Sequence, residues 1–407
     1  MFAALLADDL TGAMDAGVQW TRSVPDAAVV WTLPLPENRP ALVLTSESRN
    51  LPAAEAAARV RSAYEALLSG GYHLVYKKTD STMRGHIGTE IRTLLSFGKH
   101  RFALLCPALP AGGRSVKNGI LYVGGEPLLS SDIAKDPYSR ITSSSIPELL
   151  VRDADLSVSV FPCDETLPGA LRSFTGDVAV VDAETEEDLA FVASCLDDSI
   201  LPCGSAGLFS AICRLRQEPA RPVPAGTGTS PLPRLLTLCG SPALKSQEQM
   251  QAAANAGFLL RSLTESYAAS TLKECRLALG KGNSVILDAA GSTKEELSLR
   301  YADDAHGLQK AGARVQALLR EAALQLAGSA DGICVFGGDS ALSILSALRA
   351  DGILLRGEAQ PLVPWGTLLG GPNEGLFFST KAGGLGNTQV IPDVRLALSR
   401  LLCSRKG

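Results

Sequence analysis

The chain alternates short apolar runs with longer stretches in which apolar residues recur at helical spacing. The short runs are three to six residues long, which is typical of strands buried on both faces of a parallel sheet. They lie at residues 2–7, 28–31, 41–45, 74–77, 102–106, 158–161, 178–181, 201–203, 235–239, 285–288, 332–336 and 375–379. Helices are predicted at residues 53–68, 88–97, 205–215, 246–256, 311–327 and 340–348. This alternation predicts an α/β fold in which mostly parallel sheets are flanked by helices.

Two segments interrupt the alternation. Residues 107–147 are rich in Gly, Pro and Ser, and an irregular stretch of that length in a compact domain is more often functional than accidental. Residues 218–233 contain five prolines and fit neither a helix nor a central strand. Because 407 residues also exceed one typical core, we predict two domains, at residues 1–217 and 234–407, joined by a linker at 218–233.

Composition narrows the classes of function. The net charge is −4 and no basic tract reaches five residues, so neither nucleic acid nor an anionic membrane is an expected partner. No apolar run is long enough for a membrane span, and we expect no signal peptide, because a first strand that begins at Phe2 leaves no charged n-region. The nine cysteines form no CxxC pair, which favours small buried side chains over a zinc site. We expect a cytoplasmic enzyme.

Three turns rich in Gly and Ser follow predicted strands in the C-terminal half. Adjacent glycines leave backbone N–H groups uncovered, and a helix N-terminus behind them adds free donors and a positive dipole end. Such turns suit phosphate oxygens, although each alone is also compatible with plain tight packing. The candidate residues are Ser241, Gly337, Gly338, Asp339, Ser340, Gly383 and Gly384. The Walker G-x-x-x-x-G-K-[ST] motif is missing, and no G-x-G-x-x-G follows the first strand, which counts against a dehydrogenase.

Two adjacent acids, Asp8 and Asp9, come directly after the first predicted strand. Ligands of open α/β sheets bind at the carboxyl ends of strands. Carboxylates in that place can accept hydrogen bonds from substrate hydroxyls, orient Mg²⁺ or take a proton from an attacking hydroxyl. The alternative, which the residues leave open, is that one acid caps the following helix and the other is solvated.

A denser charged cluster follows the strand at 74–77. It contains Lys78, Asp80 and Arg84, and Gly85 allows the backbone to approach a ligand closely. The guanidinium of Arg84 can hold a carboxylate through two parallel hydrogen bonds, and Arg114 can converge on the same pocket. Cations for a carboxylate and acids for hydroxyls together suit a small polyhydroxy acid. The alternative is a surface turn with a weak local ion pair.

Taken in order, these motifs resemble the four-carbon acid sugar kinase family over nearly the whole chain. The resemblance rests on residues 7–15 (ADDLTGAMD), 77–85 (KKTDSTMRG) and 107–114 with 119–127, and on the loops at 240–241, 337–340 and 381–386. Departures from the commoner family pattern are Ala243 for Ser, Asp339-Ser340 for Glu-Thr, and the Ala and Leu at positions 382 and 385.

The resemblance implies an N-terminal substrate domain, a C-terminal nucleotide domain and a ligand cleft between them. It implies ATP-dependent phosphorylation of the terminal hydroxyl of a four-carbon acid such as D-threonate, D-erythronate, L-threonate or 3-oxo-tetronate. ATP and Mg²⁺ would then be the cofactors, the acid sugar and ATP the small-molecule partners, and a homodimer a fair expectation. Two alternatives are a non-catalytic sensor of nucleotide or sugar acid, with Ala243 and Asp339 marking a degraded site, and a dehydrogenase.

On this hypothesis each candidate residue has a role. Arg84, with Lys78 and Arg114, holds the substrate carboxylate. Asp8 and Asp9 bind its hydroxyls, and Asp9 or Asp80 helps to remove the proton from O4. The ATP phosphates lie against residues 337–340 and 383–384, and Mg²⁺, whose protein ligands the sequence leaves open, spreads the developing charge.

Overall fold

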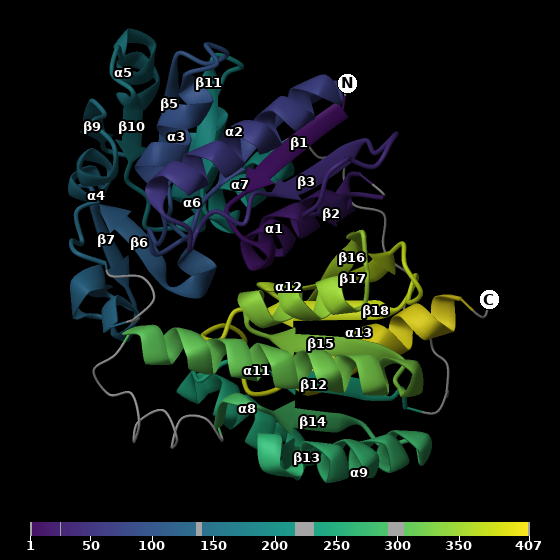
Figure 1. Cartoon of the computed structure of the whole chain (residues 1–407). Coiled ribbons are helices and arrows are strands. Elements are labelled where there is room, and N and C mark those ends of the chain that lie inside the picture. Colours follow the sequence, from purple (N-terminus) through teal and green to yellow (C-terminus); the bar gives the residue numbers. More distant parts are fainter. Residues whose placement is uncertain (1, 25, 136–140, 216–231, 292–304, 406–407) are drawn as a thin grey trace. The chain divides into compact units, whose positions relative to one another are not determined.

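The computed structural model describes residues 2–24, 26–135, 141–215, 232–291 and 305–405. The chain divides into two compact units, Met1–Ala220 (unit 1) and Arg221–Gly407 (unit 2) (Figure 1). Most of the predicted linker, residues 218–231, lies outside the described residues. Among the described helices, none is long and apolar enough to cross a membrane.

Unit 1 contains a sheet whose neighbouring strands all run parallel, in the order β2-β3-β1-β4-β11-β5-β10-β9. Its strands are β1 (Phe2–Ala7), β2 (Ala28–Val30), β3 (Ala41–Thr45), β4 (Tyr72–Lys78), β5 (Phe102–Cys106), β9 (Val158–Phe161), β10 (Val178–Val181) and β11 (Ile200–Gly204). The central strands β1, β3 and β5 are buried over most or all of their length, because helices cover both faces.

The helices of unit 1 are α1 (Leu10–Gly17), α2 (Ala53–Ser69), α3 (Ile87–Leu95), α4 (Ile146–Asp153), α5 (Leu167–Ser173), α6 (Glu186–Ser194) and α7 (Ala206–Leu215), with a short 3₁₀ turn η1 (Val18–Arg22). The crossovers through α2, α3 and α4 step along the sheet in one direction, and those through α1, α5 and α6 step back. Since parallel crossovers are right-handed, the two groups cover opposite faces. The contacts of α2 with α3, and of α1 and α6 with α7, agree with this division.

The segment at 107–147, for which the sequence predicts no strands, contains a small antiparallel sheet. It is formed by β6 (Arg114–Lys117), β7 (Ile120–Val123) and β8 (Glu126–Pro127), with 3₁₀ turns η2 (Pro110–Gly112), η3 (Leu128–Ser130) and η4 (Asp132–Lys135). The turn between β6 and β7 is Asn118-Gly119, and both residues have positive φ (52° and 70°). An Asn-Gly pair with this geometry is the favoured two-residue hairpin connection.

Unit 2 contains strands in the order β13-β14-β12-β15-β18-β17-β16. They are β12 (Leu235–Cys239), β13 (Leu259–Ser262), β14 (Val285–Asp288), β15 (Gly332–Phe336), β16 (Gly352–Gln360), β17 (Val363–Leu369) and β18 (Phe377–Lys381). The pairs from β13 to β18 are parallel, and β17 pairs antiparallel with both β18 and β16. The sequence predicts four of these strands and misses β13, β16 and β17.

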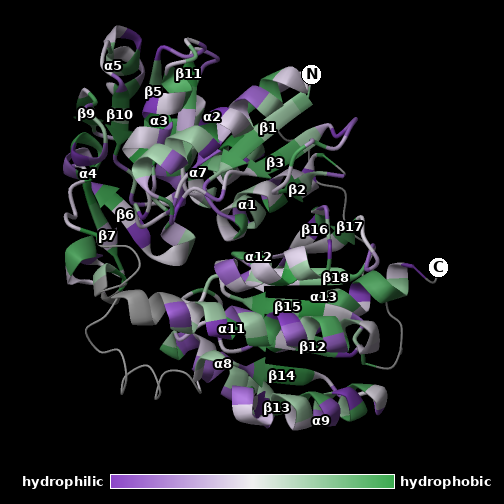
Figure 2. Cartoon of the chain, in the orientation of Figure 1, coloured by the Kyte–Doolittle hydropathy of each residue, from purple (hydrophilic) through white to green (hydrophobic). Residues whose placement is uncertain are grey.

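The helices of unit 2 are α8 (Leu244–Asn255), α9 (Ala268–Gly280), α11 (Ala305–Leu326), α12 (Gly338–Ala347) and α13 (Val390–Ser404), with 3₁₀ turns η5 (Glu265–Tyr267) and η6 (Ala327–Ser329). Helix α11 contacts α9 and α12, while α8 contacts α13, so the helices form two layers about the sheet. Figure 2 shows hydrophobic strands β12, β14 and β15 beside helices α9 and α11 that carry hydrophilic patches. All five residues of β12 and of β15 are buried.

Candidate functional site

The carboxyl ends of four neighbouring strands of unit 1 lie in register. Ala7 at the end of β1 pairs with Thr45 of β3 and with Lys78 of β4, and Lys78 pairs with Gly204 of β11. The loops that follow β1, β3 and β4 therefore leave the sheet at the same edge. They carry Asp8 and Asp9, residues 46–49, and residues 79–84 respectively.

Arg49, which belongs to none of the motifs in the sequence, joins both acids of the first loop. Its Nε and Nη2 donate to the two oxygens of Asp8 at 2.7 and 2.9 Å. Its Nη1 and Nη2 donate to the two oxygens of Asp9 at 2.7 and 2.6 Å. Asp9 also caps helix α1 by accepting the N–H of Gly12, so the capping alternative holds for Asp9, whereas Asp8 is buried rather than solvated.

Asp80 lies beside this pair and holds Arg84. The Nε and Nη2 of Arg84 donate to Asp80 at 2.8 and 3.0 Å, and the side chain of Arg84 keeps 30% exposure. The Nη1 of Arg49 lies 3.7 Å from Asp80 Oδ1, which links the two clusters. The loop turns through positive φ at Met83 and Gly85. It is therefore a compact turn built around the Asp80 carboxylate, and not a solvated surface loop.

The arginines keep the buried acids ionised. Burial alone would raise the pKa of Asp8, but Arg49 and Lys77 outweigh it and lower that pKa. Burial likewise opposes ionisation of Asp80, and Arg84 and Arg49 bring its pKa well below the usual range. Despite its own burial, Arg49 has a pKa raised well above normal by Asp8 and Asp9. The site is thus a set of fixed, alternating charges at neutral pH.

Two further predicted cations lie close to this cluster. Lys78 is buried, its Nζ donates to Thr79 O at 2.7 Å, and it approaches Gly12 so closely that a Cβ there would lie 2.8 Å from Nζ. The Nη1 of Arg114 donates to Gly112 O. Burial lowers the pKa of Arg114, with Asp80 acting to raise it and Arg84 to lower it, so the three charges are near one another.

A buried ion pair supports the loop that carries Arg49. Lys77 Nζ lies 2.6 Å from Glu90 Oε2, and both side chains are almost fully buried. Ser48 Oγ donates to Glu90 Oε1 at 2.5 Å, and the N–H groups of Ser48 and Arg49 both donate to Asp8 O. The position of Arg49 is therefore set by main-chain and side-chain contacts at once.

In unit 2 the ends of three parallel strands also align. Cys239 of β12 pairs with Phe336 of β15, which pairs with Lys381 of β18. The three predicted phosphate loops follow these residues and touch one another. A Cβ on Gly240 would overlap Ser340 Oγ, and one on Gly383 would overlap Ser241 Oγ.

Lys381 holds the third of these loops from the interior of unit 2. It is fully buried, it donates to Ala382 O and Gly383 O at 2.9 and 3.0 Å, and its Nζ lies 4.3 Å from the centre of the Phe336 ring. Burial lowers its pKa to about 8. Because its N–H groups hold two loop carbonyls inward, the opposite face of the loop is left to backbone N–H groups, which suits an anion.

The start of helix α12 fits a phosphate group. Its cap residue, Gly337, has φ 112° and provides no side-chain acceptor for the first turn. The first N–H groups of the helix can therefore meet an anion. Asp339 is the one carboxylate in the sequence of the three loops. Within the described residues no group of three or more His, Cys, Asp or Glu side chains could hold a metal.

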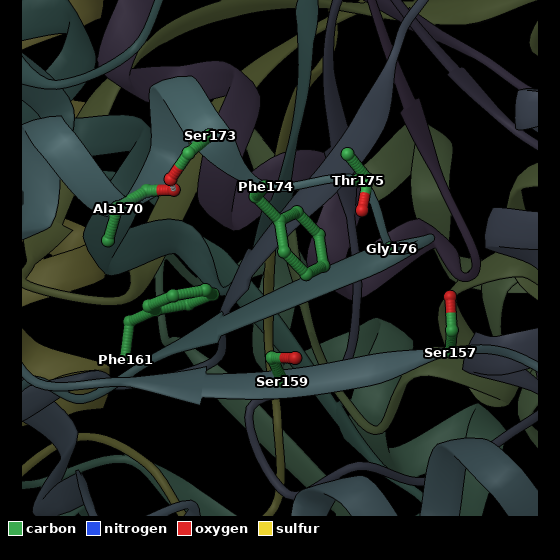
Figure 3. A pocket seen from close by; sticks show the side chains of 8 residues that line it. All are labelled: Ser157, Ser159, Phe161, Ala170, Ser173, Phe174, Thr175 and Gly176. Atoms are coloured by element: carbon green, nitrogen blue, oxygen red, sulfur yellow. Dashed lines mark hydrogen bonds between the residues drawn. The ribbon is translucent and has the colours of Figure 1, made fainter.

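Two hollows in the surface of unit 1 are lined by none of the predicted site residues. One of about 480 Å³ lies between β9 and α5, and Figure 3 shows its hydroxyl and phenyl lining. None of the predicted site residues lines it. A smaller one, of about 280 Å³, includes Met83, Gly85 and the hydrogen-bonded pair His86 and Asp153.

Known proteins resemble this chain along its whole length. Residues 3–212 match a family model described as a sugar-binding N-terminal domain, and residues 236–391 match one described as a nucleotide-binding C-terminal domain. A D-threonate kinase of Bordetella bronchiseptica is 33% identical over 405 residues, which cover 96% of each chain. A D-erythronate kinase of Heliobacterium modesticaldum is 27% identical over 433 residues, 95% of this chain and 94% of the relative.

A solved structure supports the fold. A crystal structure of a protein from Salmonella typhimurium LT2 superposes with a TM-score of 0.78 at 25% identity, covering 97% of this chain and 98% of the other. This likeness confirms the predicted α/β fold with mostly parallel sheets and flanking helices.

Proposed function

Because the chain belongs to the four-carbon acid sugar kinase family, we propose that it transfers the γ-phosphoryl group of ATP to the terminal hydroxyl of a four-carbon sugar acid. D-threonate and D-erythronate are the first candidates, since they are the acids named for two relatives. 3-Oxo-tetronate remains the alternative acid within the same reaction class.

The observation that carries the acid-sugar part of the proposal is the mixed charge cluster of unit 1. A four-carbon sugar acid has one carboxylate and a row of hydroxyls, so it needs cations at one end and acceptors along its length. Arg84, Lys78 and Arg114 are the proposed partners of the carboxylate, and Arg84 is 30% exposed at the cluster. Asp8 and Asp9 are the proposed acceptors of the hydroxyls.

The nucleotide part of the proposal rests on the three touching loops of unit 2. Ser241, residues 337–340, and residues 383–384 are the proposed phosphate contacts, through backbone N–H groups and short hydroxyls. Mg²⁺ bound with ATP would neutralise charge on the phosphates, and Asp339 is our candidate for a protein carboxylate beside it.

In the proposed reaction O4 of the acid forms a bond to the γ-phosphorus as the bond from that phosphorus to the β–γ bridging oxygen breaks, so that ADP leaves. The O4 proton passes to a carboxylate. We favour Asp9 over Asp80, because the Asp80 side chain is only 9% exposed and Arg84 and Arg49 hold its pKa well below normal. The Asp9 side chain is 17% exposed. Such chemistry depends mainly on positioning and charge stabilisation.

The test is ADP release by the purified protein with Mg²⁺-ATP against D-threonate, D-erythronate, L-threonate and 3-oxo-tetronate, with the phosphorylated product identified by mass spectrometry. We expect rapid turnover with one of these acids and little ADP release without acid. Tight ATP binding without turnover on any of them would favour the sensor alternative.

A further inference from the structure

A single guanidinium satisfies all four oxygens of two adjacent carboxylates in unit 1. Each oxygen of Asp8 and Asp9 accepts one N–H of Arg49, at distances of 2.6 to 2.9 Å. These bonds use four of the five N–H groups of the guanidinium. The Arg49 side chain is only 11% exposed, so the arrangement is shielded from water.

This geometry requires arginine. A lysine ammonium has the same charge but only three donors that radiate from one atom, so it cannot engage two carboxylates edge-on at the same time. The surrounding chain is fitted to the arginine side chain as well. Gly85 has φ 89°, and a Cβ on it would come within 3.2 Å of Arg49 Cγ and 3.4 Å of Arg49 O. The loop that carries Asp80 and Arg84 therefore packs directly on Arg49.

We propose that Arg49 is the positioning residue of the acid-binding site, which fixes Asp8 and Asp9 for the substrate hydroxyls and ties the Asp80–Arg84 loop to them. This role rests on the proposed function, because it assumes that Asp8 and Asp9 receive the acid. With both carboxylates held by one rigid, planar group, their remaining lone pairs point in fixed directions before the substrate arrives. Such preorganisation reduces the cost of ordering the site during the reaction.

The charges around Arg49 come from four chain segments. Asp8 and Asp9 follow β1, and Asp80 and Arg84 lie in the loop after β4, while Lys77 and Lys78 at the end of β4 also act on Asp8. Glu90 of α3 pairs with Lys77, and Arg114 of β6 lies near Asp80 and Arg84. Removal of Arg49 leaves Asp8 with the two lysines and Asp80 with Arg84, but it removes the side-chain cation bonded to Asp9.

The kinetic test is Arg49→Lys, with Arg234→Lys as the matched control. Arg234 of unit 2 holds Asp331 through the same kind of two-pronged contact, at 3.0 and 2.6 Å. We expect Arg49→Lys to lower kcat/KM for the acid by about 100-fold, as a misplaced reactive group does, with the KM for ATP little changed. The control should retain nearly full activity. Retention of wild-type kcat/KM by Arg49→Lys, or equal losses for acid and ATP, would overturn the proposal.

A second measurement does not depend on turnover. Without Arg49 the pKa values of Asp8 and Asp80 must rise, so Arg49→Met leaves buried carboxylates that become protonated at a higher pH than in the wild type. The deficit in melting temperature of Arg49→Met should therefore be largest near pH 7 and narrow toward pH 4. A deficit that stays constant over this range would refute the carboxylate-holding role. If the wild type phosphorylates no acid in the panel, the proposed function fails, and this unfolding series still decides the role of Arg49.

Discussion

Arg84 differs from Arg49 in that a ligand can reach it. Asp80 holds two of its N–H groups, yet 30% of the side chain is exposed, compared with 11% for Arg49. Asp80 raises the pKa of Arg84, so its charge is permanent. An exposed, permanently charged guanidinium that is oriented by an internal carboxylate can bind a ligand carboxylate with little loss of its own freedom.

We therefore predict that Arg84→Ala raises the KM for the acid by about 10- to 100-fold, the value of one or two charge-assisted hydrogen bonds. The KM for ATP should stay within about twofold of wild type, because the three phosphate loops are in unit 2. Steady-state kinetics with each substrate varied in turn will measure both constants. Arg61→Ala on α2, where the arginine packs over Phe97, is the control. Equal effects on the two KM values would contradict the role of Arg84.

Lys381 presents the opposite case, a cation whose burial makes its charge costly. Its pKa is lowered to about 8, chiefly by burial and further by Lys245, with Cys239 and Cys334 opposing. In the unfolded chain the pKa returns to about 10.4. Between these two values the unfolded state binds more protons than the folded state, so this group makes the folded state more stable as pH rises from about 8 to about 10.4.

The predicted size of this effect is about 3 kcal/mol over that interval. We expect the free energy of unfolding of the wild type to increase with pH relative to Lys381→Met, which removes the titrating group and keeps the chain length. Urea denaturation of both proteins at pH 7, 8, 9 and 10 will measure the difference. A wild-type advantage that does not change with pH would show that burial does not depress the pKa of Lys381.

At the scale of elements, the two neighbouring glycines of the third phosphate loop have different surroundings. A Cβ on Gly383 would overlap Ser241 Oγ and lie 3.3 Å from Ala243 Cβ, whereas one on Gly384 would meet nothing within 4 Å. Helix α8 holds the same loop, since Ser246 Oγ donates to Gly383 O at 3.0 Å. The loop is therefore confined on the side that faces Ser241.

This contrast predicts that Gly383→Ala weakens ATP binding by about tenfold or more, the value of roughly one hydrogen bond in this cluster. Gly384→Ala should cost less, because its methyl group points into open space. Isothermal titration calorimetry with Mg²⁺-ATP will compare them. Gly328→Ala, at another open position of unit 2, is the control for folding. Similar losses for the two neighbouring glycines would indicate that the loop is not held by the contact with Ser241.

The elements that the sequence predicts are those marked by a continuous apolar run or by apolar residues at helical spacing. The buried parallel strands read as continuous apolar runs, and the structure has strands at each of the predicted positions. The sequence does not predict β16 and β17. Strand β16 is buried in its first four residues and partly exposed over most of the rest, so it does not form one continuous apolar run. The hairpin at β6 and β7 was predictable, since Asn118-Gly119 between two short runs is a strong turn signal that the irregular composition of the segment concealed.

Among the charged residues of the candidate site, too, the sequence predicts some and misses others. Asp8 and Asp9 stand directly after a predicted strand, and Asp80 and Arg84 belong to a dense run of charged residues that follows another, at the edge where an open α/β sheet gathers its ligands. Arg49 stands four residues beyond the strand β3, in a stretch that resembles an ordinary polar loop. Only the parallel pairing of β1 with β3 brings it onto Asp8 and Asp9, and such pairing of distant segments is not encoded in local spacing.

At the scale of the whole molecule, each unit has a buried apolar core of its own, as an independently folding domain does. Unit 2 has a core of buried apolar side chains drawn from its sheet, α8 and α13, among them Leu235, Ile286, Phe336 and Leu398. Unit 1 has its own buried strands β1, β3 and β5. A core of this kind is the main requirement for independent folding.

We therefore predict that polypeptides 1–217 and 234–407, produced separately, each fold cooperatively. The C-terminal piece should bind Mg²⁺-ATP with an affinity close to that of the full chain, because all three phosphate loops belong to it. The N-terminal piece should show stabilisation by the acid in a thermal-shift assay. Neither piece alone should phosphorylate the acid, since the acceptor and the donor sites are on different polypeptides. Loss of ATP binding by the folded C-terminal piece would mean that unit 1 contributes essential nucleotide contacts, and unfolding of either piece would place the domain boundary elsewhere.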